Sequence, residues 1–462
     1  MIRAVYFILF LSILFYSFLI TGCSSPDTGQ KDRAFIHGQI TVDAELDTTA
    51  NYSGIQLFIG SPDTLGELTD TVFYAETDRQ GFFEGTAQFE NRNMYSLFIS
   101  RHDERLAYQD LVLADGDTIR VNAELPDFQE TAELISREND LYQKYERLEN
   151  GINRVFQFVN AGLVTGDSLE IEIMKWSNLF WDFHREYDDP FAGERAAISS
   201  VALLEGWDHE LMMERLRELV RSDSRFVPFA SRIGLRYYAR NVSLESALAF
   251  LDTLDTYHSS SEFSMDLQRN RIELLYDSAR VEDARRLLRQ FKQEYTEIPE
   301  SRSWIDRFEY DLTSLAPGAE VPDFQVRTIE DERITKHSML GSAYLLELTQ
   351  LDNRLYQQQY DRGIAIYHIY KNYGIEFVTI PIRSSEVMVN AFFSERPRLW
   401  HVARPGSFDE EELRDQFNIN VIPTRILVDS EGNVIRKYEG TEFNDIISGL
   451  RQILNSNTED PL

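Results

Sequence analysis

The sequence predicts a multidomain α+β protein with an N-terminal β-sandwich-like domain, a central α-helical region and a C-terminal α/β domain. Its 462 residues suffice for about three domains of ordinary size. Hydrophobic residues make up 43% of the chain, which is enough for several packed cores. The hydrophobic period changes twice along the chain. It passes from strict alternation to a helical repeat, and then to buried apolar runs separated by helical segments.

Residues 33–126 are expected to form the β-sandwich-like domain. Short alternating segments such as Phe35–Val42 predict strands. Glycine and aspartate at Asp78–Gly81 and Asp115–Asp117 predict tight turns between them. A succession of short strands joined by such turns is typical of a small sandwich.

Residues 127–315 carry a helical period with few glycines. Ala247, Leu251 and Leu254 lie on one face of a predicted helix, and Ser243 is placed to cap its start. One hairpin has the character of a helical repeat, but no second copy follows at a fixed spacing. An irregular helical bundle therefore remains the first interpretation, with true repeats as the alternative.

Residues 316–456 alternate between strand and helix patterns. Two near-continuous apolar runs, Ala343–Leu348 and Ile375–Ile382, predict strands buried on both faces. Helical patterns follow at Leu355–Tyr373 and at Phe443–Leu454. This order predicts an α/β domain with helices covering a central sheet.

Charge and cysteine content exclude several classes of function. The chain has 46 Lys and Arg against 77 Asp and Glu, a net charge of −31. Such a chain repels phosphate backbones, so a nucleic-acid partner is excluded. A single cysteine rules out an internal disulfide, a cysteine-based zinc site and a CxxC pair. We find no histidine spacing or glycine-rich motif that indicates a metal or a cofactor, and we expect neither.

The first 22 residues read as an export signal. Arg3 is followed by an apolar run from Ala4 to Ile20, which ends in small residues. The segment Leu19–Cys23 resembles a bacterial lipobox, in which the chain is cut before the cysteine and the thiol is acylated. This resemblance makes Cys23 the lipidation site and residues 23–32 a polar tether. An uncleaved signal anchor is the alternative.

The C-terminal region resembles the thioredoxin-like, TlpA-type redoxin family. The resemblance rests on ordered segments that match the family pattern: Pro317–Gly318, Pro322–Phe324, Tyr344–Leu348, Gly374–Ile380 and Val421–Val434. It implies a thioredoxin-like fold over residues 316–456, about a third of the chain. The preceding β region resembles the domain found before such folds in envelope lipoproteins of the Bacteroidetes type. The implied location is the cell envelope, most simply the outer membrane, with either face left open.

The chain departs from this family at the position that carries its chemistry. The family places a W-C-x-x-C motif a few residues after the central strand, where the helix N-terminus lowers the thiol pKa. Here the two cysteine positions fall near Asn353 and Tyr356. Neither an amide nor a phenol forms a mixed disulfide. We therefore expect no thiol-disulfide oxidoreductase or peroxidase activity from this domain.

The family pattern also implies a binding surface that needs no cysteine. It carries a cis proline, here at Ile422–Pro423, beside the CxxC position, and a substrate chain pairs there as an added strand. Two arginines are expected to add positive charge and to favour acidic partners. The candidate groove residues are Asp352, Arg354, Tyr356, Ile422, Pro423 and Arg425. The alternative is that side chains such as Leu355 and Tyr356 fill the hollow.

Three functions follow from these observations. The first is a lipid-anchored, redox-inactive thioredoxin-like protein that binds an unknown envelope protein or peptide. The second is a structural or assembly lipoprotein that works through its helical region. The third is an enzyme that uses Asp352, Arg354, Tyr356 or His401 in place of cysteine, although no nucleophile and base are evident.

Overall fold

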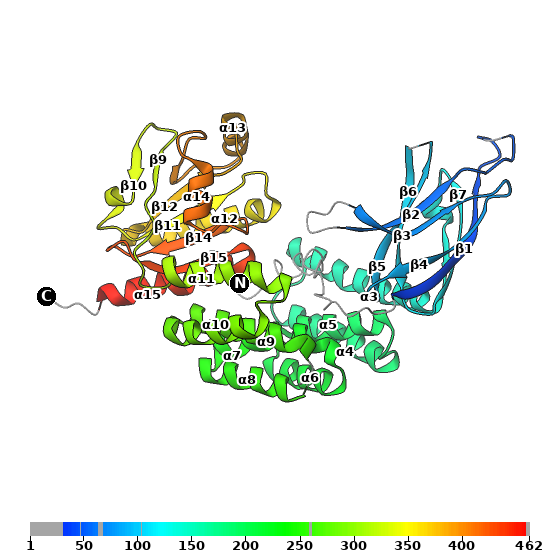
Figure 1. Cartoon of the computed structure of the whole chain (residues 1–462), viewed down its shortest axis with the longest axis horizontal. Coiled ribbons are helices and arrows are strands. Elements are labelled where there is room, and N and C mark those ends of the chain that lie inside the picture. The colour runs from blue at the N-terminus through cyan, green and yellow to red at the C-terminus, as the bar shows by residue number, and fades with distance from the viewer. Residues whose placement is uncertain (1–30, 47, 63–67, 103, 258–260, 459–462) are drawn as a thin grey trace. The chain divides into compact units, whose positions relative to one another are not determined.

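The computed structural model describes residues 31–46, 48–62, 68–102, 104–257 and 261–458 (Figure 1). The predicted signal peptide, Cys23 and nearly all of the predicted tether lie outside these residues. Within the described part of the chain, no helix combines the length and apolarity needed to cross a membrane.

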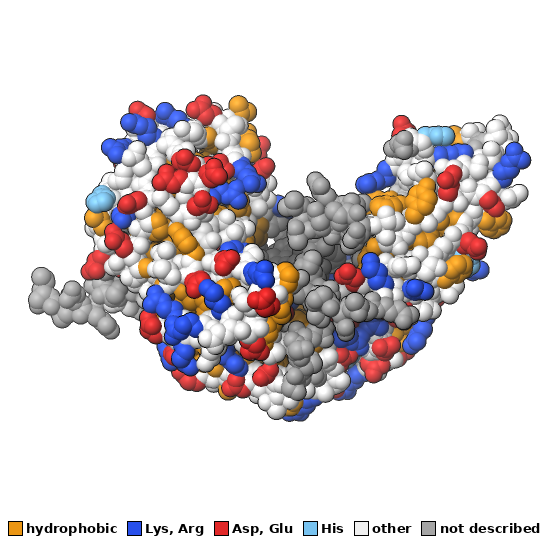
Figure 2. Space-filling model, in the orientation of Figure 1, with side chains coloured by type: hydrophobic (Ala, Val, Ile, Leu, Met, Phe, Trp, Pro, Cys, Tyr) orange, Lys and Arg blue, Asp and Glu red, His pale blue; other side chains and the backbone are white. Residues whose placement is uncertain are grey.

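The chain forms two compact units, one ending at Tyr237 and the other running from Tyr238 to Leu462. This division differs from the three regions expected from the sequence, because it falls inside the predicted helical region. The earlier helices group with the β domain, and the later ones group with the C-terminal α/β domain. On the face shown in Figure 2, acidic and basic side chains are mixed across each unit.

The first unit begins with two four-stranded sheets that pack as a sandwich. One sheet has the order β4-β1-β7-β8 and the other has the order β3-β2-β5-β6. The strands are β1 (Asp32–Val42), β2 (Gln56–Pro62), β3 (Leu68–Glu76), β4 (Phe82–Phe89), β5 (Asn93–Arg101), β6 (Glu104–Leu113), β7 (Thr118–Leu125) and β8 (Glu133–Ile135). The predicted strands of this region are confirmed.

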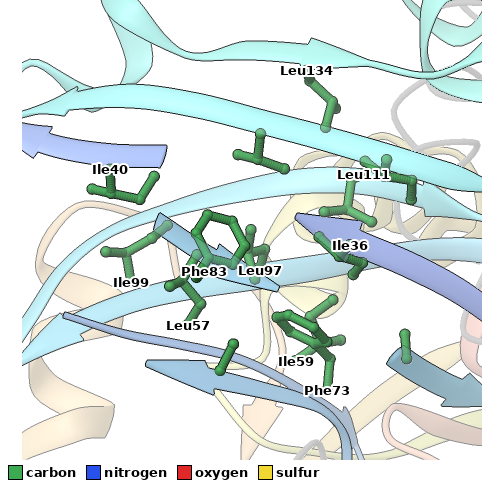
Figure 3. Packing of buried hydrophobic residues seen from close by; sticks show 14 of the residues in the cluster. Ile36, Ile40, Leu57, Ile59, Phe73, Phe83, Leu97, Ile99, Leu111 and Leu134 are labelled. Atoms are coloured by element: carbon green, nitrogen blue, oxygen red, sulfur yellow. The ribbon is translucent and has the colours of Figure 1, made fainter. Parts of the chain in front are cut away.

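A single apolar core joins the two sheets (Figure 3). Ile36 and Ile40 of β1 meet Leu57 of β2 and Leu97 of β5, and all four side chains have no solvent exposure. Alternate residues of each strand point inward, which is the physical basis of the alternating pattern in the sequence. The turn before β4 needs Gly81, because its φ is +85° and a Cβ there would lie 2.2 Å from the carbonyl oxygen of Ile40.

Helices follow the sandwich. Those assigned mainly to the first unit are α2 (Phe128–Thr131), α3 (Arg137–Asn160), α4 (Asp167–Glu186), α5 (Phe191–Leu204), α6 (His209–Ser222) and α7 (Val227–Asn241). Those of the second unit are α8 (Leu244–Tyr257), α9 (Ser261–Asp277), α10 (Val281–Tyr295) and α11 (Pro299–Ser314). The predicted cap is confirmed, since Ser243 Oγ accepts the N–H of Ser246 at 3.1 Å.

The second unit ends in a five-stranded sheet of order β13-β12-β11-β14-β15. Its strands are β11 (Tyr344–Thr349), β12 (Glu376–Pro381), β13 (His401–Val402), β14 (Thr424–Val428) and β15 (Val434–Glu439), and a hairpin of β9 (Gln325–Arg327) and β10 (Arg333–Thr335) precedes them. The helices are α12 (Arg354–Tyr370), α13 (Glu386–Ser394), α14 (Glu410–Gln416) and α15 (Ile446–Thr458). Strand β11 is parallel to β12 and antiparallel to β14.

Both faces of this sheet are covered. One face packs Leu346 and Val378 against Phe417 after α14, and the other packs Leu345 and Phe377 among side chains of α12, α13 and α15. Every residue of the central strand β11 is buried. The continuous apolar runs of the sequence therefore mark strands that are buried on both faces, as predicted.

Candidate functional site

Helix α12 begins where the family motif is expected. Asn353 is its N-cap, and Asn353 Oδ1 accepts the backbone N–H of Tyr356 at 3.0 Å. An amide at this position satisfies one of the helix's unpaired N–H groups, which a thiol would do poorly. Asn353 also reaches the loop before β14, because its Nδ2 lies 3.5 Å from the carbonyl oxygen of Ile422.

Tyr356 belongs to the core and not to a groove. Its residue exposure is only 1%, and its ring lies 5.9 Å from the rings of both Tyr360 and Phe392. Burial, with Glu347 nearby, holds the pKa of the Tyr356 phenol well above its ordinary value. The phenol therefore stays neutral. The expectation that Tyr356 lines the groove is wrong, because its ring fills the space beneath α12.

Arg425 is likewise buried, with an exposure of 1%. Its Nε lies 2.7 Å from Glu347 Oε1, and the two residues stand directly opposite each other on β14 and β11. The expectation that Arg425 adds positive charge to the groove is therefore wrong. The sequence contains one signal of this pair: Glu347 and Arg425 are each the charged residue of an otherwise apolar strand segment.

A chain of hydrogen bonds completes the buried ion pair. Glu347 Oε2 accepts from Thr379 Oγ1 at 2.8 Å, and Thr379 Oγ1 in turn accepts from Trp400 Nε1 at 2.8 Å. On the other side, Arg425 Nη1 donates to Gln359 Oε1 at 2.9 Å. The network connects β11, β12, β14 and α12 directly beneath the first turns of α12. Its polar atoms are paired within the protein, so it serves positioning and gives no reactive group to solvent.

The loop before β14 contributes the other side of the site. The Ile422–Pro423 peptide bond is cis, which confirms the prediction. Pro423 is buried and Ile422 is half-buried, whereas Asp352 and Arg354 are exposed. We call the exposed part of this region the α12–Pro423 surface, and we define it by Asp352, Asn353, Arg354, Val421 and Ile422.

His401 stands apart from this surface. Its ring nitrogens lie 3.5 Å from Glu332 and 3.7 Å from Glu376, at the β13 edge of the sheet. His401 therefore faces two carboxylates of that edge, whereas Tyr356 is buried in the core beneath α12. Among the described residues, no group of His, Cys, Asp and Glu side chains is placed to hold a metal ion.

A cavity of about 830 Å³ lies elsewhere in the same domain. The β9–β10 hairpin and α14 line it, with Lys336 and Asp409 among the polar side chains of its wall. Lys336 is already paired, because its Nζ lies 2.8 Å from carboxylate oxygens of Glu320 and Asp323. None of the residues of the α12–Pro423 surface lines this cavity.

Comparison with known proteins finds similarity over about a third of the chain. The chain is 21% identical over 143 residues to the thiol-disulfide oxidoreductase ResA of Bacillus cereus, a match that covers 31% of this chain and 80% of that protein. It is 22% identical over 142 residues to ResA of Bacillus subtilis, covering 30% of this chain and 77% of that protein. No family model matches the chain.

Solved structures show the same kind of neighbour. A thiol:disulfide interchange protein of the thioredoxin family from Chlorobium tepidum aligns with a TM-score of 0.27 and 19% identity, over 30% of this chain and 98% of that one. The thioredoxin domain of a thiol-disulfide oxidoreductase from Bacteroides vulgatus aligns with a TM-score of 0.27 and 18% identity, over 29% and 97%. The similarity to ResA supports a thioredoxin-like redoxin fold for the C-terminal domain.

Proposed function

We propose that this protein is a lipid-anchored component of the cell envelope whose thioredoxin-like domain binds a protein segment and performs no thiol exchange. The observation that carries the proposal is the role of Asn353 and Tyr356, the two residues at the expected cysteine positions. One caps α12 and the other packs in the core. Both side chains have structural roles that a thiol would not fill equally well.

The α12–Pro423 surface has the features of a strand-addition site. Within the described residues, the backbone N–H of Ile422 makes no hydrogen bond to the protein. An extended segment placed beside Ile422 would find an available donor there, as in other cases of β-strand addition. Arg354 and Asp352 flank the site at the start of α12 and are both exposed. Two arginines were expected to favour acidic partners. Because Arg425 is buried, only Arg354 is exposed at this site.

The chain that starts at Ser24 should not reduce insulin disulfides above the rate seen without protein. It contains no thiol, since Cys23 is the only cysteine. The informative comparison is the Asn353→Cys variant of the same chain. Its thiol would stand at a helix N-terminus, so we expect its pKa to fall below the ordinary value of about 8.5.

Cysteine at the exposed position 358 of the same helix is the matched control for that variant, and its pKa should stay near 8.5. The rate of alkylation by iodoacetamide as a function of pH measures both values. Equal pKa values at 353 and 358 would show that the start of α12 lacks the electrostatics of a thioredoxin-like active site.

Binding is tested by capture from an envelope extract. We expect the wild type to retain a partner that an Arg354→Glu, Pro423→Ala double variant retains at less than about a tenth of that amount. Both substitutions alter the α12–Pro423 surface or its support. Circular dichroism and urea unfolding check that the variant is folded. Recovery of the same proteins in equal amounts by both chains would contradict the proposal.

A further inference from the structure

A second cavity, of about 320 Å³, adjoins the proposed binding surface. Helices α9 and α11 form one side, and the segment Asn418–Val421 with the end of β15 forms the other. All of these elements belong to the second compact unit. We call this cavity the α9–α11 pocket. Val421 lines the pocket and also belongs to the α12–Pro423 surface, so a chain bound on that surface could place a side chain in the pocket.

Carboxylates outnumber cations in the wall of this pocket. Two basic side chains, Arg307 and Lys437, face five acidic ones: Glu273, Asp277, Asp311, Glu439 and Glu442. Lys437 is fully engaged, since its Nζ lies 3.0 Å from both Asp311 and Glu439 and donates to the carbonyl oxygen of Asn418. Its side chain is only 3% exposed, so its charge is balanced within the wall.

The other three carboxylates, Glu273, Asp277 and Glu442, have no lysine beside them in the described part of the chain. Arg436 Nη2 lies 2.8 Å from Asp277 and 3.8 Å from Glu442. Glu273 accepts only from the neutral indole N–H of Trp304, at 2.9 Å. Arg307 directs its Nε to the carbonyl oxygen of Ser303 at 3.2 Å. Arg269 also lies next to this group, with its guanidinium carbon 5.4 Å from the Trp304 ring centroid. The five carboxylates of the wall thus face four cations in and beside it, Arg269, Arg307, Arg436 and Lys437, so the carboxylates still outnumber the cations.

The titration behaviour of these groups agrees with that excess. Burial, together with Glu442 and Glu273, raises the pKa of Asp277 to about 8 in spite of Arg436. Burial also raises the pKa of Glu273 and of Glu442. A cation that enters the pocket would stabilise the ionised carboxylates, so its binding should strengthen as the pH rises from 6 to 9.

The remaining wall has aromatic side chains, Tyr276, Trp304 and Phe308, together with Val421 and the amides Asn418 and Asn420. Trp304 and Phe308 of α11 stack with their ring centroids 4.9 Å apart and their planes 9° from parallel. An alkyl chain packs well against such rings, and long basic side chains combine an alkyl stem with a charged head. The pocket therefore combines an acidic wall with aromatic side chains, and this combination suits a cationic side chain.

We infer that the α9–α11 pocket binds a lysine or arginine side chain of the segment that the α12–Pro423 surface is proposed to hold. This inference rests on the proposed function and specifies the partner as basic near the bound strand. The bound segment would then place a basic side chain in the pocket, and an acidic group beside Arg354 at the start of α12 stays compatible with it.

A lysine side-chain mimic tests the pocket directly. We expect n-butylammonium to shift the indole N–H resonance of Trp304 in the chain that starts at Ser24, with apparent affinity increasing from pH 6 to pH 9. The Trp304→Phe variant assigns that resonance. n-Butanol, which has the same alkyl stem without the charge, should bind at least tenfold more weakly. Equal responses to the two compounds, or affinity independent of pH, would overturn the inference.

Glu273→Gln is the variant of choice, because glutamine keeps an oxygen that accepts from Trp304. We expect it to weaken n-butylammonium binding about fivefold. Glu297→Gln removes a carboxylate from the turn between α10 and α11, at a side chain that is 90% exposed, and it should leave binding unchanged. Unchanged binding by Glu273→Gln would also count against the pocket.

The two proposals fail in different ways. If Trp304 does not respond while Arg354→Glu, Pro423→Ala abolishes partner capture, the pocket inference is wrong and the proposed function stands. If Glu273→Gln lowers both n-butylammonium binding and partner capture while Glu297→Gln lowers neither, the pocket inference is supported. If Trp304 responds but the surface variant captures partners as wild type does, the linkage between pocket and surface is overturned.

Discussion

Replacing Arg425 by methionine is expected to lower the free energy of unfolding by about 3–5 kcal/mol. The substitution leaves the carboxylate of Glu347, whose side chain is 4% exposed, without its cation. Thr379 would still donate one hydrogen bond to it, but a buried charge needs more than one neutral donor to offset its lost hydration. Urea unfolding followed by tryptophan fluorescence measures the change.

Two further variants make the cause of that loss clear. In the Glu347→Gln, Arg425→Met double variant no charge is buried, so most of the lost stability should return. Lys292→Met removes a cation from the exposed pair with Glu309 and should stay close to wild type. If Arg425→Met unfolds at the same urea concentration as Lys292→Met, the buried pair does not stabilise the site as described.

Replacing Cys23 by serine is expected to abolish lipid attachment completely. Cys23 is the only cysteine of the chain and follows Leu19–Gly22, a segment that resembles a lipobox, so no other thiol can accept a thioether-linked lipid. Each buried CH2 of an acyl chain contributes about 0.8 kcal/mol to membrane binding. The variant should accumulate as an uncleaved precursor that incorporates no radioactive fatty acid.

Ser24→Ala is the matched control for that experiment, because it changes the neighbouring residue and keeps the thiol. It should be labelled and processed like the wild type. Undiminished labelling of the Cys23→Ser chain would contradict lipidation at this residue. Gel mobility of the precursor and the processed form supplies a second readout that does not depend on labelling.

The α/β domain was predictable because its features are local. Alternating or continuous apolar segments of a few residues are enough to indicate β11 and β12. The placement of Asn353 at the start of α12 follows from its distance to the central strand. The cis bond at Ile422–Pro423 came only from the family resemblance, since a proline in an ordinary sequence context is usually trans.

The buried pair and the pocket were not predictable because they depend on distant residues. Glu347 and Arg425 are 78 positions apart, and only the register of β11 against β14 brings them together. Asp311 and Lys437 are 126 positions apart. The sequence alone therefore indicates a surface charge at Arg425 and a separate helical domain, whereas α9 and α11 complete the wall beside Val421.

The central claim is that the α12–Pro423 surface holds a partner in the cell. Site-specific photo-cross-linking tests it most directly, with a photoreactive side chain at position 354 at the start of α12. Position 369 near the other end of the same helix is the control, since Ile369 is 58% exposed. We predict a discrete protein adduct from position 354 and none from position 369. The same adducts from both positions, or adducts from position 369 alone, would contradict the account.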